Sequence, residues 1–356
     1  MATVTKMGKA PEPPQHEPAS DSAMNSLVLQ NLARGDFQKE TITQALLLKR
    51  KAQEDLFQLA QKKRDEYFPS KKVEIRTVIE MSNICRQNCD FCNISSYSNE
   101  RKYILGYEEF LKIVAYLYRH KRRVLLLQSG ENRAQSYIDH VSRCISAVKT
   151  KYPDMEIILC LGNLSNRQYG QLREAGGDRY LLKFETSNAV LYRRLKPLDT
   201  LEERLECLSA LHALGFDLSS GNIIGLPSQN LEDIVEDLYL LGRLPLKMAS
   251  TSVFIPGEES HCRSEPTGNL DIALNYMALM RLMYSHFLIP STSFLEKARK
   301  GGQCQGLMAG ANTVTIHDGT PEEYKKYFPI YSVKRITPND KHLRRIATRA
   351  NLIFDR

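Results

Sequence analysis

Three cysteines within eight residues are the part of this sequence best suited to chemistry. Cys85, Cys89 and Cys92 directly follow residues 73–81, a run typical of a β-strand. Thiolates with C-x3-C-x2-C spacing can reach three corners of a cubane iron–sulfur cluster, and no fourth cysteine follows nearby in the sequence to complete the ligation. One iron is therefore left open, and an open metal position can bind a substrate or cofactor.

A structural zinc site is the alternative interpretation of these thiols. Zinc knuckles normally use four Cys or His ligands in paired clusters. The sequence has no second C-x2-C pair and no H-x3-H pair. The spacing therefore favours an iron–sulfur cluster.

The cysteine motif resembles the signature of the radical S-adenosylmethionine superfamily, in which an aromatic residue precedes the last cysteine, here Phe91. The resemblance implies that Cys85, Cys89 and Cys92 hold a [4Fe–4S] cluster. It also implies that the free iron chelates the amino and carboxylate groups of S-adenosylmethionine. One electron from the cluster would then cleave this cofactor to methionine and a 5′-deoxyadenosyl radical.

The composition indicates which settings and partners to expect. The chain has 356 residues and a net charge of +8, and its basic residues are spread along amphipathic segments, which is typical of solvated helix faces and not of a nucleic-acid surface. Eight cysteines without an export signal favour a reducing cytoplasm. No apolar stretch reaches the roughly 18 residues that suggest a membrane span. We therefore expect a cytoplasmic protein that binds neither membrane nor nucleic acid.

The order of predicted elements favours one α/β domain. Residues 26–68 show a helical pattern that Pro69 ends, and strand-like and helical segments alternate after it. Such alternation predicts a parallel sheet built from right-handed βαβ units, here a complete or nearly complete (β/α) TIM-like barrel with an N-terminal helical extension. The expected divisions are a disordered tail (1–22), N-terminal helices (23–70), the radical S-adenosylmethionine barrel (71–330) and a C-terminal tail or helix (331–356).

Polar residues follow the second and fourth predicted strands. Ser129, Gly130 and Glu131 come after the second strand, where glycine permits close backbone approach and a carboxylate can accept hydrogen bonds from an ammonium group. They resemble the Gly-Gly-Glu segment of the superfamily, which holds the methionine amino group, with Ser129 in place of the first glycine. Glu185 should emerge where the fourth strand ends, and Arg204 on the next helix could clasp a carboxylate; a surface pair between Arg204 and a nearby Glu is the alternative.

The sequence segments around Glu185 and Arg204 resemble those of the biotin synthase group, and most closely those of its hydrogenase-maturase branch. That resemblance implies that Glu185 and Arg204 contact S-adenosylmethionine. The segment containing Gly221, Ile223 and Gly225 resembles the G-x-I-x-G motif of the group, whose backbone would pair with an adenine edge. Phe254 would add apolar contact to the adenine, or would belong to a plain core strand.

The sequence leaves the reaction itself open. Relatives in this group divide into sulfur inserters that need a second cluster, such as biotin and lipoyl synthases, and enzymes without sulfur transfer, such as the hydrogenase maturase and methylornithine synthase. Three scattered cysteines are candidate ligands for a second cluster, namely Cys160, Cys262 and Cys304. His317 and Asp318 are candidate proton-handling residues, with a surface His and a helix-capping Asp as the alternative.

We expect maturase-like chemistry on a small or carrier-bound substrate in cofactor biosynthesis, with an electron donor such as flavodoxin or ferredoxin. A sulfur-inserting lipoyl or biotin synthase-like enzyme is the second candidate. The third is a non-catalytic iron–sulfur protein, which would not need Gly130, Glu131, Glu185 and Arg204 together.

Overall fold

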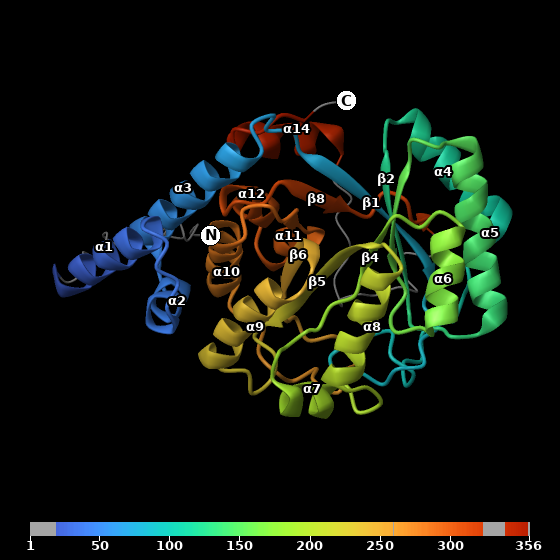
Figure 1. Ribbon diagram of the computed structural model, residues 1–356, viewed down its shortest axis with the longest axis horizontal. Helices are drawn as coiled ribbons and strands as arrows, with labels where there is room; N and C mark the ends of the chain where they lie inside the picture. Colours follow the sequence, from blue (N-terminus) through green and yellow to red (C-terminus); the bar gives the residue numbers. More distant parts are fainter. Residues whose placement is uncertain (1–18, 259, 323–338, 355–356) are drawn as a thin grey trace, which may run out of the picture.

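Three helices form an extension at one side of the molecule (Figure 1). The computed structural model describes residues 19–258, 260–322 and 339–354. The extension consists of α1 (Ala19–Ala33), α2 (Lys39–Leu46) and α3 (Arg50–Tyr67). Helix α1 begins within residues 1–22, which the sequence analysis gives to a disordered tail; residues 1–18 of that tail lie outside the described residues. Asn275 on a later helix donates to the carbonyls of Leu46 and Leu48 at 3.0 and 2.8 Å, which joins the extension to the body of the protein.

The body is a parallel eight-stranded sheet with the strand order β6-β5-β4-β3-β2-β1-β8-β7 in the described residues. The strands are β1 (Glu74–Ser82), β2 (Val124–Ser129), β3 (Glu156–Cys160), β4 (Arg179–Leu181), β5 (Asp217–Ile224), β6 (Leu246–Val253), β7 (Pro290–Ser291) and β8 (Thr313–Ile316). The ends of this order, β6 and β7, meet through a single bridge between Met248 and Leu288. The sheet therefore curls into a nearly closed barrel, which confirms the predicted fold class.

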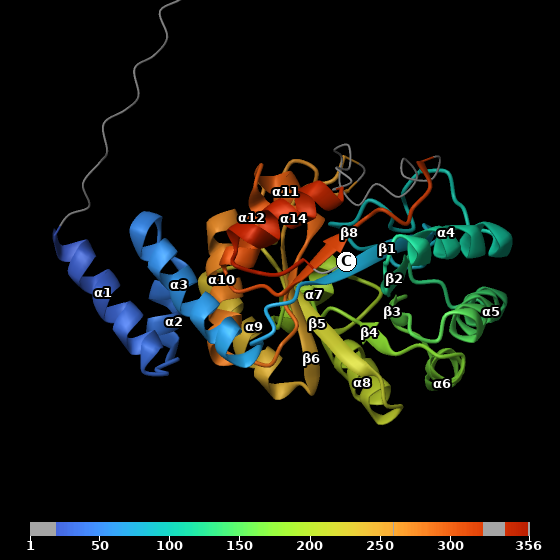
Figure 2. The same cartoon turned by 90° about the horizontal axis from the view of Figure 1, so that it is seen from above.

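Helices cover the outside of the barrel. They are α4 (Tyr107–Arg119), α5 (Gln135–Lys151), α6 (Asn166–Glu174), α7 (Ala189–Leu195), α8 (Leu201–Ala213), α9 (Leu231–Arg243), α10 (Leu270–Met283), α11 (Ser293–Ala298), α12 (Gly302–Met308) and α14 (Asp340–Arg349). Helices α4, α5 and α6 flank one side of the sheet, and α9 and α10 flank the other (Figures 1 and 2).

Strand residues alternate between the two faces of the barrel wall, as the two-residue period of a β-strand requires. Ile79, Leu125 and Leu127 belong to the large core between strands and helices. Val78, Leu126, Ile158 and Met248 form a separate apolar cluster. These residues of the second cluster also line a cavity inside the barrel.

A group of ion pairs involves residues at the amino ends of the strands. The Arg179 guanidinium contacts Glu74 at 3.0 Å, and its Nε lies 2.6 Å from Glu156. Arg76 contacts the same Glu74 at 2.6 Å. Two cations and two carboxylates balance each other, as buried charges require. The loops that follow the strands lie at the opposite, carboxyl end, where catalytic loops gather in such folds.

Strand β4 is shorter than the sequence predicts. The expected strand spans residues 179–184, whereas regular pairing stops at Leu181. The hydroxyl of Ser220 donates to the Leu182 carbonyl at 2.7 Å and accepts from the Phe184 amide at 3.2 Å. The Ser220 side chain thus interrupts the backbone ladder between β4 and β5, and backbone pairing resumes at Glu185, whose amide donates to the Gly221 carbonyl at 3.0 Å.

Candidate functional site

The cysteine loop leaves β1 at the carboxyl end of the barrel and is closed at its base. The Ser82 hydroxyl donates to the Tyr103 carbonyl at 2.7 Å, and the Asn83 amide donates to the Arg101 carbonyl at 2.8 Å. Ser82 also forms an antiparallel bridge with Ile104. The loop that carries Cys85, Cys89 and Cys92 is therefore anchored at both ends.

The environment of the three thiols suits cluster ligands. All three are free of disulfides. Burial raises the pKa of each thiol. Backbone N–H groups lower it again, those of Gln87 and Glu131 at Cys85 and that of Ile94 at Cys92. The Glu131 amide lies 3.3 Å from the Cys85 sulfur. Such N–H···S bonds stabilise ligated sulfur and help to set cluster potentials.

No group of three or more His, Cys, Asp or Glu side chains in the described ranges is arranged around a point that one metal ion could occupy. A cubane places a different demand on its ligands, because each thiolate binds a different iron. The three cysteines all line one cavity. This arrangement fits a cluster located at the mouth of that cavity.

Gly130 allows the end of β2 to touch the cysteine loop. Its amide donates to the Ser82 carbonyl at 3.0 Å. A Cβ atom at this position would lie 2.4 Å from the Ile84 carbonyl oxygen and 2.7 Å from the Cys85 Cβ. The close approach predicted for this glycine therefore exists, but the partner is the cysteine loop.

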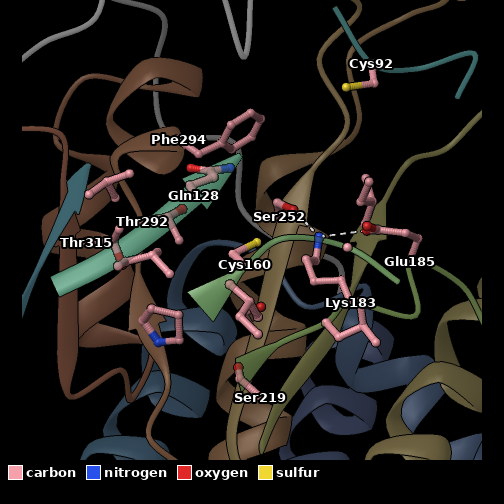
Figure 3. Close-up of a pocket in the computed structure, with 18 of the residues that line it drawn as sticks. Cys92, Gln128, Cys160, Lys183, Glu185, Ser219, Ser252, Thr292, Phe294 and Thr315 are labelled. Carbon is pink, nitrogen blue, oxygen red and sulfur yellow. Dashed lines mark hydrogen bonds and ion pairs between the residues drawn. The ribbon is translucent and has the colours of Figure 1, made fainter. Parts of the chain in front are cut away.

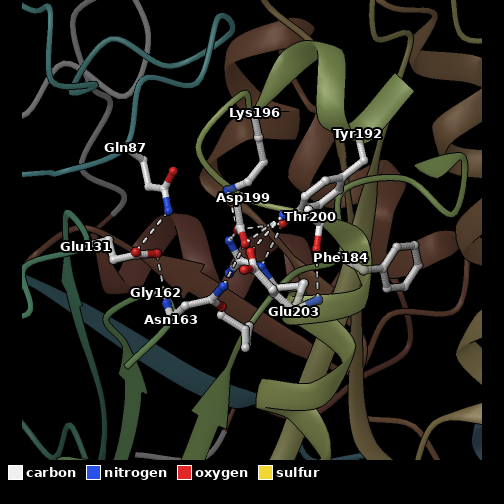
Figure 4. A network of polar contacts seen from close by, with 12 residues as sticks. Gln87, Glu131, Gly162, Asn163, Phe184, Tyr192, Lys196, Asp199, Thr200 and Glu203 are labelled. Carbon is white, nitrogen blue, oxygen red and sulfur yellow. Dashed lines mark hydrogen bonds and ion pairs between the residues drawn. The ribbon is translucent and has the colours of Figure 1, made fainter. Parts of the chain in front are cut away.

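The Glu131 carboxylate is already fully engaged by the protein (Figure 4). Its Oε1 accepts from the Gln87 side chain at 2.9 Å and pairs with Arg86 at 3.2 Å and Arg133 at 3.4 Å. Its Oε2 accepts from the Asn163 amide at 2.9 Å. This carboxylate therefore joins the cysteine loop to the segments after β2 and β3, which is a positioning role that the sequence analysis missed.

A cavity of about 380 Å³ extends from the cysteine loop into the barrel. Figure 3 shows Cys160, Lys183 and Glu185 together at its wall. The lining also includes Ser129, which stands in place of the first glycine of the Gly-Gly-Glu motif. Buried side-chain atoms of the lining that have no hydrogen-bond partner among the described residues include Gln87 Oε1, Thr251 Oγ1 and Thr292 Oγ1. Such atoms are costly to leave unsatisfied, so they favour a polar ligand in the cavity.

Glu185 occupies a strained backbone position at the cavity wall. Its φ is +63°, in the left-handed region that non-glycine residues seldom adopt. The strain is held by two backbone bonds, from Glu185 N–H to the Gly221 carbonyl at 3.0 Å and from Ile223 N–H to the Glu185 carbonyl at 2.9 Å. Strained residues cluster at ligand sites. The side chain contacts Lys183 at 3.0 Å, and Lys183 donates to Ser252 at 2.8 Å.

A further carboxylate, that of Asp237, supports the strained backbone at Glu185 through hydrogen bonds. Asp237 accepts hydrogen bonds from the Ser187 amide at 2.6 Å and from the Asn222 side chain at 2.8 Å. The backbone of Asn222 in turn forms a parallel β-bridge with that of Glu185. Burial raises the pKa of Asp237 to about 7, against hydrogen bonds from Asn222 and Ser187 that lower it. Asp237 lies within α9, and no sequence motif there predicts that it supports Glu185.

Arg204 is buried, so the surface-pair alternative for it is wrong. Its Nη2 lies 2.7 Å from Asp199 and its Nε donates to the Tyr192 hydroxyl at 2.9 Å. The Tyr192 hydroxyl donates to the same Asp199 oxygen at 2.8 Å. The guanidinium is therefore fixed in orientation at the cavity wall. The Lys196 ammonium lies 3.5 Å from the same Asp199 oxygen, and Figure 4 shows Lys196, Tyr192 and Asp199 together.

The glycines of the β5 segment are explained by packing within the protein. A Cβ at Gly221 would lie 1.7 Å from the Ser250 carbonyl oxygen, and one at Gly225, whose φ is +85°, would lie 2.3 Å from Gly268. The Ile223 carbonyl accepts from Gln229 at 2.9 Å, and the Gly225 amide donates to the same side chain at 2.7 Å. The backbone of this segment is thus largely paired already, which disagrees with the prediction of an adenine-pairing edge.

The apolar residues predicted near the adenine do come together. Phe254 belongs to a buried cluster with Leu191, Leu195 and Leu226, and both Phe91 and Ile223 pack against it. Phe91, Ile223 and Phe254 all line the cavity. They provide an apolar wall beside the cysteine loop.

The structure separates the two candidate proton-handling residues. His317 lines the cavity, and its Nδ1 lies 3.1 Å from the Glu80 carboxylate. Asp318 instead pairs with Arg122 at 2.8 Å, and Arg122 also pairs with Asp340 of α14 at 2.8 Å. Asp318 therefore anchors the C-terminal helix and is withdrawn as a catalytic candidate, because its carboxylate is directed to Arg122.

The cysteines considered for a second cluster lie in three different places. Cys160 lines the cavity. Cys262 belongs to the apolar cluster of Phe254, and its amide donates to the Asp90 carbonyl. Cys304 is buried next to α14, with its sulfur 4.0 Å from the Ile346 carbonyl.

No helix among the described residues is both long and apolar enough to span a membrane.

Comparison with known proteins agrees with this geometry. The family model for the radical SAM superfamily matches residues 79–241. The chain is 33% identical to the [FeFe] hydrogenase maturase subunit HydE of Thermotoga maritima, over 86% of this chain and 87% of that protein. It is 28% identical to biotin synthase 2 of Frankia casuarinae, over 74% and 73% of the two chains. The fold matches that of methylornithine synthase (PylB) with a TM-score of 0.81 at 22% identity, over 92% of this chain and 97% of the other.

Proposed function

Because this chain belongs to the radical S-adenosylmethionine superfamily, we propose that it cleaves S-adenosylmethionine reductively at a [4Fe–4S] cluster held by Cys85, Cys89 and Cys92. The cofactors of this superfamily are a [4Fe–4S] cluster and S-adenosylmethionine, which together supply a 5′-deoxyadenosyl radical. The observation that carries the proposal is the position of the three thiols at the mouth of a cavity whose wall holds Glu185 and Arg204.

The protein groups have distinct roles in this proposal. Arg204, oriented by Asp199 and Tyr192, binds the methionine carboxylate through a charge-assisted hydrogen bond. Glu185 accepts hydrogen bonds from the ribose hydroxyls. Phe91 and Phe254 pack against the adenine and exclude water from the reacting atoms. Glu131 positions the cysteine loop, in place of the ammonium contact that the motif suggests.

We further propose that the substrate is a small molecule, free or carrier-bound, that enters the cavity near His317 and is used in cofactor biosynthesis. Similarity to the hydrogenase maturase subunit supports maturase-like chemistry. The electron comes from a donor such as flavodoxin or ferredoxin, in a reducing cytoplasm. A sulfur inserter is the second candidate, and the observation that favours it is Cys160 at the cavity wall.

The test is electron paramagnetic resonance of the anaerobically reconstituted and reduced protein. Adding S-adenosylmethionine should change the g-values of the reduced cluster, because the methionine amino and carboxylate groups bind the open iron. Methylthioadenosine lacks both groups and should leave the spectrum unchanged. A spectrum that S-adenosylmethionine does not alter would indicate a cluster closed by a fourth ligand, as in an electron carrier.

A further inference from the structure

Two buried cations share one buried carboxylate beside the cysteine loop. Lys196 and Arg204 are each 5% exposed, and Asp199 is 1% exposed. Arg204 lies 2.7 Å from Asp199 Oδ2, whereas the Lys196 ammonium lies 3.5 Å from the same oxygen. The other oxygen of Asp199 accepts from Asn163 and from the Thr200 amide. Two buried cations therefore share one carboxylate, and the three side chains together carry a net positive charge.

The neighbouring carboxylate does not serve Lys196. Glu131 is held by Arg86 and Arg133 at 3.2 and 3.4 Å. Within the part of the chain that the structure describes, the other contact of the Lys196 ammonium is a cation–π contact with Tyr192, whose ring centroid lies 5.5 Å away. A buried ammonium without a dedicated counterion is costly. The site therefore calls for an anion next to Lys196.

The geometry places Lys196 against the cysteine loop. The Asp90 amide, next to Cys89, donates to the carbonyl of Leu195 at 2.9 Å. Lys196 lines the same cavity as the three cysteines. The backbone bond and the shared cavity place Lys196 beside the cysteine loop.

We propose that Lys196 is the countercharge of the iron–sulfur cluster and favours its one-electron reduction. A [4Fe–4S] cluster held by three thiolates is negatively charged, and the electron taken from an external one-electron donor makes it more negative. A fixed cation in a water-poor site stabilises this added charge, since net charge and exposure set cluster potentials. Arg204 remains available for a carboxylate ligand. The inference rests on the cluster assignment of the proposed function, and it deepens that assignment.

The experiment is a potentiometric titration of the reduced-cluster signal without S-adenosylmethionine, in the parent, Lys196→Met and Lys196→Arg proteins. Lys196→Met should make reduction about tenfold less favourable, equivalent to a midpoint lower by about 59 mV for a one-electron couple. Lys196→Arg should restore most of the parent value. Arg194→Met is the matched control: Arg194 is exposed in the last turn of α7, two residues before Lys196, so solvent screens its charge and the midpoint should not move.

An unchanged midpoint in Lys196→Met, at full iron content, would overturn the proposal. Equal shifts in the Met and Arg variants would also overturn it, because packing and not charge would then be responsible. If Lys196→Met does not retain a cluster, Lys196→Gln provides the same comparison with a polar side chain. Because the titration contains no S-adenosylmethionine, the midpoint potential can be interpreted even if the protein fails to bind or cleave that cofactor.

Discussion

Replacing Cys85, Cys89 and Cys92 together by alanine is expected to abolish the cluster and, with it, all cleavage of S-adenosylmethionine. The three thiols are the cysteines of the loop after β1, and the Glu131 amide already points at the Cys85 sulfur at 3.3 Å. Iron and sulfide analysis, visible absorption and paramagnetic resonance of the anaerobically reconstituted variant provide the measurement. Near-zero iron is the predicted result.

The same variant decides whether a second cluster exists. Only an auxiliary cluster could remain in it, and Cys160, Cys262 and Cys304 lie in three different surroundings. About four irons per chain, lost when Cys160 is also replaced, would favour the sulfur-inserting alternative. Cys144→Ala is the control, because Cys144 is buried on α5 away from the cavity and its loss should leave the cluster intact.

Glu185→Gln and Arg204→Ala are expected to weaken S-adenosylmethionine binding by about tenfold to hundredfold each. Each change removes a charge-assisted hydrogen bond, which typically contributes about 1.5–3 kcal/mol. Anaerobic calorimetric titration measures the affinity. Glu202→Gln, an exposed change on the helix that carries Arg204, should bind as the parent does.

Arg204→Ala also removes the main partner of Asp199, so thermal unfolding must accompany the titration. Arg204→Lys keeps the positive charge and should retain the fold, but it loses the fixed orientation that Tyr192 gives the guanidinium. Parent-like affinity in Glu185→Gln together with folded Arg204→Ala would contradict the placement of the cofactor on this wall.

Much of the barrel could be predicted because its strands are short apolar runs between amphipathic helices. The strands expected at residues 73–81, 156–161, 216–224 and 313–316 agree with β1, β3, β5 and β8 to within one residue at each end. The end of β4 could not be predicted, since it depends on the Ser220 hydroxyl entering the ladder from the next strand. The two short helices α11 and α12 were missed, since helices of one or two turns carry little periodic pattern.

The site could be predicted where one motif supplies several groups, and not where loops converge. The cysteine loop was accessible from residue types and spacing, whereas Phe91 and Phe254 were accessible through the resemblance to the family motifs. The partners of Glu131 were not, because Gln87 and Asn163 reach it from two other segments. Asp318 was misread for the same reason, since Arg122 lies almost two hundred positions earlier in the chain.

The central claim is that the cluster loop and the cavity wall act together on S-adenosylmethionine. The most direct measurement is the quantity of 5′-deoxyadenosine and methionine formed by the reduced, anaerobic protein, determined by mass spectrometry against a reaction without reductant and against the Cys85/Cys89/Cys92 variant. We predict equal amounts of both products in the parent and none in either control. An intact, fully reduced cluster that yields no 5′-deoxyadenosine above the cluster-free variant would contradict the account.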